Sequence, residues 1–116
     1  MSSLAWPFES EVRQLVALLS RGEYEALEQL TGGERLSASE LARAVRDYPG
    51  TLRDPPTPEA APLDVISVRA AAMPTWAVVV PLWTVEEGRS DLSLELTVRE
   101  RVEGGFQIEI DDLHVL

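Results

Sequence analysis

The residues whose types could do chemistry gather at the C-terminal end, where two carboxylates and the only histidine occur as Asp111, Asp112 and His114. A carboxylate beside an imidazole can act as a general acid–base pair when both side chains enter a pocket. Tyr48, at the end of a predicted helix, is a third candidate. The candidates for catalysis are therefore His114, Asp112 and Tyr48, although the pattern as a whole leans away from an enzyme.

The direction of the Asp112 and His114 side chains depends on the strand that carries them. Even positions are apolar from Phe106 to Ile110, whereas the apolar residues Leu113 and Val115 are odd. In an uninterrupted strand, Asp112 and His114 would share the apolar face with the core. A β-bulge at positions 111–112 would add one residue and turn Leu113 and Val115 inward and His114 outward. The sequence favours the bulge and a surface histidine.

Other patterns argue against a cofactor or a metal. The chain has no cysteine, which excludes disulfides, thiolate nucleophiles and zinc–cysteine sites. Gly32-Gly33 and Gly104-Gly105 have the spacing of turns and not of phosphate-binding loops. Glu95, Glu109 and Asp111 alternate along predicted strands, a pattern more typical of a solvated face than of a calcium site. We expect no cofactor and no metal.

The charge of the chain limits its partners. Twenty acidic and ten basic residues give a formal net charge of −10, which repels nucleic-acid backbones and anionic membranes. Such a surface suits a basic protein partner, and it also suits plain solubility. The first residues lack a basic leader region, and the longest apolar run, 76–83, is too short to span a bilayer. We expect a cytoplasmic protein, which the absence of cysteine also fits.

A meander of three strands, 75–85, 91–101 and 106–115, must position these residues. Its even positions form one apolar face with the period of two that marks a half-buried strand. The first strand is apolar on its odd face as well, which predicts a subunit interface there. Pro81 cannot donate to a ladder and should face an edge or a bulge. The predicted interface residues are Ala77, Val79, Trp83 and Val85.

The register of the last two strands follows from keeping even positions opposite even positions. A three-residue loop at 103–105 achieves this and supplies a glycine for the left-handed position. That loop sets Val102 opposite Phe106 and 98 opposite 110. It also sets Arg99 opposite Glu109, as an ion pair on the polar face.

Three helices precede the sheet, at 8–19, 23–30 and 38–48. The third has the sequence of a capping box, with Glu40 three residues after Ser37. The segment 51–62 holds four prolines and reads as an extended connector to a first strand at 63–69. The chain is thus predicted to be a single α+β domain, 1–116. Its three N-terminal helices pack on one face of a curved four-stranded antiparallel sheet.

The turn Gly22-Glu23-Tyr24-Glu25-Ala26-Leu27, the broad strand at 76–85 and the closing strand carry a resemblance. The chain resembles the nuclear transport factor 2-like, cystatin-like superfamily of cone-shaped α+β domains, and small uncharacterised bacterial domains of that shape. The resemblance implies a cone whose enzymes use Asp, His and Tyr in a pocket between helices and sheet. Members often have five or six strands, whereas four are evident here. The superfamily includes isomerases, dehydratases, immunity proteins and structural dimers.

Three functions remain open. The favoured one is a non-catalytic interaction module that forms a homodimer through its sheet. The second is a small-molecule-binding or isomerase/dehydratase-like pocket protein, which needs His114 or Asp112 inside an enclosed cavity. The third is an acidic immunity or inhibitor protein directed at a basic toxin.

Overall fold

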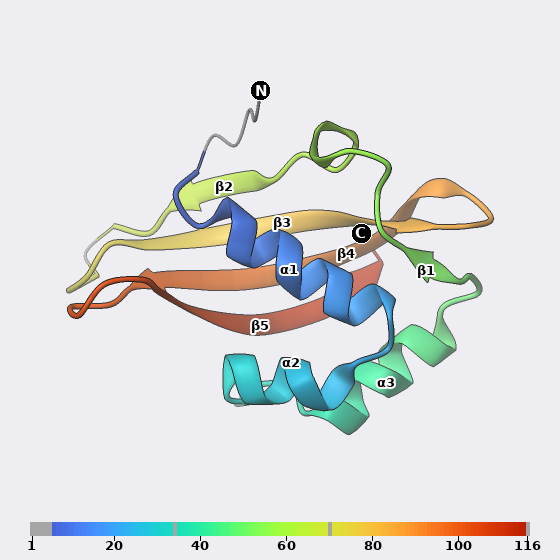
Figure 1. Cartoon of the computed structure of the whole chain (residues 1–116), viewed down its shortest axis with the longest axis horizontal. Helices are drawn as coiled ribbons and strands as arrows, with labels where there is room; N and C mark the ends of the chain where they lie inside the picture. Colours follow the sequence, from blue (N-terminus) through green and yellow to red (C-terminus); the bar gives the residue numbers. More distant parts are fainter. Residues whose placement is uncertain (1–5, 34, 70, 116) are drawn as a thin grey trace.

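The computed structural model describes residues 6–33, 35–69 and 71–115, so both ends of the predicted 1–116 domain lie outside the described residues. The α+β class is confirmed, with three helices followed by a curved antiparallel sheet (Figure 1). The elements are α1 (Glu9–Ser20), α2 (Tyr24–Thr31), α3 (Ala38–Asp47), β1 (Leu52–Arg53), the 3-10 helix η1 (Pro58–Ala60), β2 (Asp64–Ser67), β3 (Thr75–Thr84), β4 (Gly88–Glu100) and β5 (Phe106–Val115).

The start of α3 and the end of α2 lie where the sequence supplies caps. At α3, the Ser37 hydroxyl accepts from the Glu40 amide at 3.3 Å, and the Glu40 carboxylate accepts from the Ser37 amide at 2.9 Å. This is the predicted capping box, which satisfies two donors that a helix start otherwise leaves free. Gly32 ends α2 with a φ of +84°, in the left-handed region that favours glycine.

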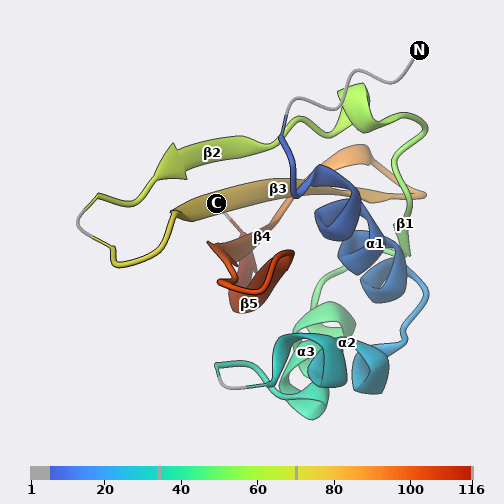
Figure 2. The ribbon, with the colours of Figure 1, turned by 60° about the vertical axis from the view of Figure 1, so that its left-hand side comes forward.

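The core lies between the helices and one face of the sheet, called here the inner face. Figure 2 shows α1 lying against this face, with α2 and α3 beyond it on the same side. Even positions of β3 and β4 point inward, as the period of two predicts. At one end, the Phe8 ring lies 5.0 Å from that of Trp76 and 5.8 Å from that of Phe106. The fully buried side chains include Phe8, Val12, Leu15, Leu19, Val78, Val80, Leu94, Leu96 and Val98.

The strand β3 is flanked by β4 on one side and by two short strands on the other. β1 pairs with residues 83–84 of β3, and β2 pairs with residues 76–79. The predicted connector at 51–62 begins with β1. It is not extended throughout, because η1 interrupts it. Thr57 caps η1 and Pro58 occupies its first turn, a position that suits proline. From α1, Arg13 donates to the Ala61 carbonyl at 2.7 Å and to the Pro58 carbonyl at 3.1 Å.

Pro81 lies at an irregularity, as its missing N–H requires. The register between β3 and β4 shifts between Pro81 and Trp83. Pro81 also falls between the residues that pair with β1 and those that pair with β2. At this irregularity the Ser90 hydroxyl donates to the Leu82 carbonyl at 2.8 Å and so links the two strands. The prediction of an edge or bulge at this proline is confirmed.

The predicted register of β4 and β5 is wrong by two residues at the hairpin end. Arg99 lies opposite Gln107, and 98 lies opposite 108. The loop spans 101–105 and closes with a bond from the Arg101 amide to the Gly105 carbonyl at 3.0 Å. Val102 belongs to this loop and is 86% exposed, so it does not pair with Phe106. A shift of two residues keeps every side chain on its predicted face, and alternation therefore could not detect it.

The predicted bulge near the end of β5 is confirmed. Asp112 lies opposite Glu95 and Ile110 lies opposite the next residue of β4, which leaves Asp111 as the additional residue. After the bulge Leu113 is buried, and His114 lies opposite Ser93 on the other face. Val115 lies opposite the buried Leu92, on the inner face as predicted, but as the last residue of the strand it is 55% exposed.

Candidate functional site

The face of the sheet opposite the helices, called here the outer face, holds most of the candidate residues. It receives the odd positions of β3 and β4, and His114 after the bulge in β5. Its β4–β5 half is polar and its β2–β3 half is largely apolar. These two halves offer different chemistry.

His114 lies between two carboxylates in the polar half. Its Nδ1 is 2.6 Å from an Asp112 oxygen, and its Nε2 is 3.0 Å from a Glu95 oxygen. The bulge makes this contact possible by setting Asp112 opposite Glu95. The other Asp112 oxygen accepts from the Leu113 amide at 2.8 Å, which fixes the carboxylate. Each ring nitrogen of His114 thus faces a carboxylate oxygen.

This arrangement does not offer a free general base. Both ring nitrogens of His114 are already engaged, and the side chains of the cluster are partly exposed on the outer face. A general base needs a nitrogen within reach of a substrate proton. The structure therefore brings His114 and Asp112 together, but outside the space between helices and sheet.

Tyr48 lies in a different part of the molecule, where α3 ends. Its hydroxyl donates to a Glu87 carboxylate oxygen at 2.7 Å, and this bond raises the pKa of Tyr48. Beside it, Glu86 accepts from the Thr51 amide at 2.8 Å and from its hydroxyl at 3.0 Å, and the amide bond is the main cause of a lowered pKa of Glu86. These contacts tie the β3–β4 turn to the start of β1. Tyr48 thus connects the end of α3 to the β3–β4 turn.

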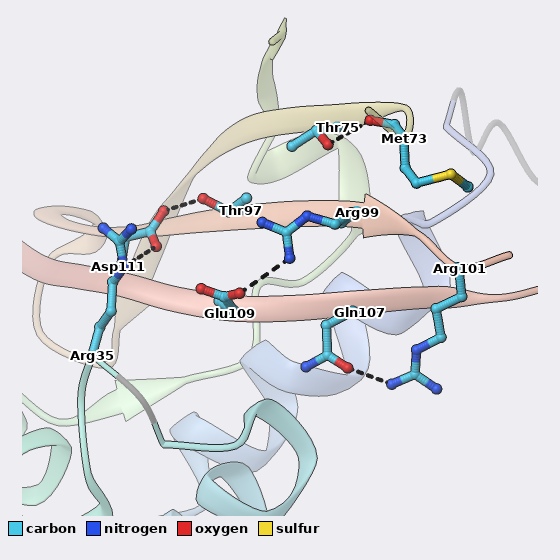
Figure 3. A network of polar contacts seen from close by, with 9 residues as sticks. All are labelled: Arg35, Met73, Thr75, Thr97, Arg99, Arg101, Gln107, Glu109 and Asp111. Carbon is cyan, nitrogen blue, oxygen red and sulfur yellow. Dashed lines mark hydrogen bonds and ion pairs between the residues drawn. The ribbon is translucent and has the colours of Figure 1, made fainter. Parts of the chain in front are cut away.

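A row of polar contacts crosses the outer face along β4 and β5 (Figure 3). The Thr97 hydroxyl donates to Asp111 at 2.6 Å, and the Arg35 Nε lies 3.5 Å from the other oxygen of the same carboxylate. Arg99 contacts Glu109 at 3.3 Å, so the predicted ion pair forms diagonally across the strands. Sequence reasoning missed Arg35 and the role of Glu95. The register of β4 and β5 would have revealed the role of Glu95, whereas the contact of Arg35 depends on the path of the loop before α3.

The β2–β3 half of the outer face is apolar. Ala77 and Val79 of β3 are half-buried there, and Ile66 of β2 lies opposite Ala77 with 64% of its surface exposed. Val68 follows in the same row and is 44% exposed. We call Ile66, Val68, Ala77 and Val79 the apolar strip. The sequence pointed to the β3 members, whereas Ile66 and Val68 were missed because the apolar residues at 63–69 do not alternate regularly enough to mark one face.

The other two predicted interface residues lie elsewhere. The Trp83 indole donates to the Ala60 carbonyl at 3.1 Å, and the Arg53 guanidinium lies 5.9 Å from its ring centre. These contacts already use much of the Trp83 surface within the chain. Val85 is exposed in the turn after β3.

Residues 6–33, 35–69 and 71–115 show neither a metal-binding cluster nor a membrane-spanning helix. No group of three or more histidine, aspartate or glutamate side chains in these ranges has the arrangement of a metal site. No helix in them is both long and apolar enough to cross a membrane. One hollow, at the start of α2, has a volume of about 530 Å³ and is lined by residues 22–26, 38 and 39.

Comparisons with known proteins place the chain in a family. No curated protein and no solved structure matches it. One family model matches residues 16–116, from the middle of α1 to the end of the chain. Since this match covers far more than half of the sequence, the chain belongs to DUF7668, a family described as a domain of unknown function.

Proposed function

We propose that this protein is a non-catalytic interaction module that forms a homodimer through the β2–β3 half of its sheet. The observation that carries the proposal is the apolar strip, whose most exposed member is Ile66. Exposed apolar side chains gathered on one face are typical of interaction sites. The helices take the inner face, so nothing among the described helices covers this strip.

The charge on the outer face supports an interface confined to the β2–β3 half. Glu95, Glu109 and Asp112 point outward from β4 and β5. Stacking two such halves would bring like charges together, in a protein whose net charge is −10. An interface through the apolar strip avoids this repulsion between like charges.

The state of the candidate catalytic residues supports a non-catalytic role. His114 has both nitrogens engaged and Tyr48 donates to Glu87. The raised pKa of Tyr48 keeps its phenol protonated at neutral pH, so it does not act as a base there. We also propose a cytoplasmic location, in line with the absence of cysteine. A nuclear transport factor 2-like fold remains our proposal, supported by three helices ahead of a curved sheet.

Light scattering over a range of micromolar concentrations tests the dimer. We expect twice the monomer mass for the natural chain and the monomer mass for Ile66→Glu. The control is Val102→Glu, which adds the same charge at an exposed apolar residue of the β4–β5 loop. A natural chain that stays monomeric at every concentration refutes the proposal. A thermal shift with a small molecule, or capture of a basic protein, would favour the two alternative functions.

A further inference from the structure

The strand β2 has one edge bonded to β3 and one edge open. The Val68 amide donates to the Thr75 carbonyl of β3 at 2.9 Å. Backbone groups alternate in direction along an antiparallel strand, so those of Asp64, Ile66 and Val68 point to β3. Those of Val65 and Ser67 therefore point away from it. In the sheet of the described residues, β3 is the neighbour of β2.

The other edges of the sheet are protected in ways that β2 is not. β5 carries a bulge and outward acids, and both α2 and α3 contact it. β1 is two residues long. Bulges, charges and shortness are devices that keep strand edges from pairing with another chain. β2 has no charge between Asp64 and Arg69 and presents Ile66 and Val68 to solvent.

We propose that the partner of this edge is β2 of a second copy, paired antiparallel about a two-fold axis at Ser67. This inference rests on the proposed homodimer and specifies how its two copies meet. A two-fold axis perpendicular to the sheet places the outer faces of both copies on the same side of the joined sheet. Centring the axis on Ser67 sets Ser67 opposite Ser67 and brings Val65 level with Arg69 of the other copy, in the turn that follows β2.

The side chains fit this register. Ile66 of each copy lies opposite Val68 of the other, on the outer face, in the closer non-hydrogen-bonded type of pair. The antiparallel direction also sets the acidic end at Asp64 beside the basic end at Arg69 of the second copy. A parallel pairing would place Asp64 beside Asp64. The two apolar strips then form one continuous surface across the joined sheets.

Cysteine crosslinking tests the register directly, because the natural chain contains no cysteine. Directly opposed hydrogen-bonded residues have Cα atoms about 5.5 Å apart, within the range of about 4.4–6.8 Å that a disulfide spans. We expect Ser67→Cys to give a disulfide-linked dimer under mild oxidation, reversed by reductant. The control Ile66→Cys lies one residue away and opposite Val68, and is expected to remain uncrosslinked. Crosslinking of Ile66→Cys in place of Ser67→Cys overturns the register.

A proline variant separates edge pairing from face stacking. Ser67→Pro removes an open-edge N–H, and proline is tolerated on an edge strand whose N–H faces solvent. Circular dichroism checks that the variant is folded, and light scattering is expected to show loss of the dimer. A dimer that survives Ser67→Pro but is lost in Ala77→Glu overturns the edge pairing while leaving the proposed homodimer intact. A monomeric natural chain overturns both.

Discussion

Replacing Arg13 by methionine tests how the proline-rich connector is held. The Arg13 guanidinium donates to the carbonyls of Ala61 and Pro58 and pairs with Glu9 at 2.8 Å, and its side chain is only 17% exposed. Methionine keeps an apolar stem of similar length but removes all three contacts. Each contact is worth about 1 kcal/mol net, so we expect the free energy of unfolding to fall by about 3 kcal/mol.

The assay is urea unfolding followed by circular dichroism. With an m-value of about 1.5 kcal/mol/M, the midpoint should fall by about 2 M. The matched control is Arg21→Met, which removes a pair between α1's end and the same connector. Arg21 lies 3.6 Å from Asp54 and is 63% exposed, so this change should cost at most about 0.5 kcal/mol. Equal losses in the two variants would refute the view that Arg13 anchors the connector to α1.

Three further changes probe other contacts. Ser37→Ala removes half of the capping box and should lower the free energy of unfolding by about 1 kcal/mol, whereas an unchanged urea midpoint would contradict the cap. The lowered pKa of Glu86 means that its bonds to Thr51 stabilise the fold above the ordinary value of 4.5 and are lost as pH falls below it. Glu86→Gln should therefore flatten the loss of thermal stability in that acidic range, and an unaltered pH profile would count against this. His114→Gln should change the unfolding free energy by less than about 1 kcal/mol, because its ion pairs are partly exposed, and a larger loss would show a structural role.

The sequence predicted features that depend on neighbouring residues. The period of two assigned inner and outer faces, and Ser37 with Glu40 predicted the start of α3. Pro81 predicted an irregularity because it lacks an N–H, and the change of apolar phase after Ile110 predicted the bulge. Each of these signals depends only on residues close together in the sequence, and each indicates a single local structure.

Features that depend on distant residues escaped prediction. The β4–β5 register is set by the conformation of the loop at 101–105, where Gly104 and Gly105 both have positive φ. The contact of Arg35 with Asp111 joins a helix loop to a strand more than seventy positions away. Trp83 appeared to be an interface residue, yet Ala60 and Arg53 already satisfy it within the chain. Such pairings can be known only when the register and the path of the connector are known.

The bulge in β5 gives Asp111 two separable roles. Its carboxylate binds Thr97 and Arg35, while its backbone sets the phase of every residue that follows. Replacing Asp111 by asparagine would alter the first role alone. Deleting it would remove the bulge and leave a regular strand, in which Ile110 and Leu113 still face inward and Asp112 and His114 still face outward. The bulge therefore compensates for one additional residue: a strand that kept all its residues and ran without the bulge would turn Asp112 and His114 toward the core.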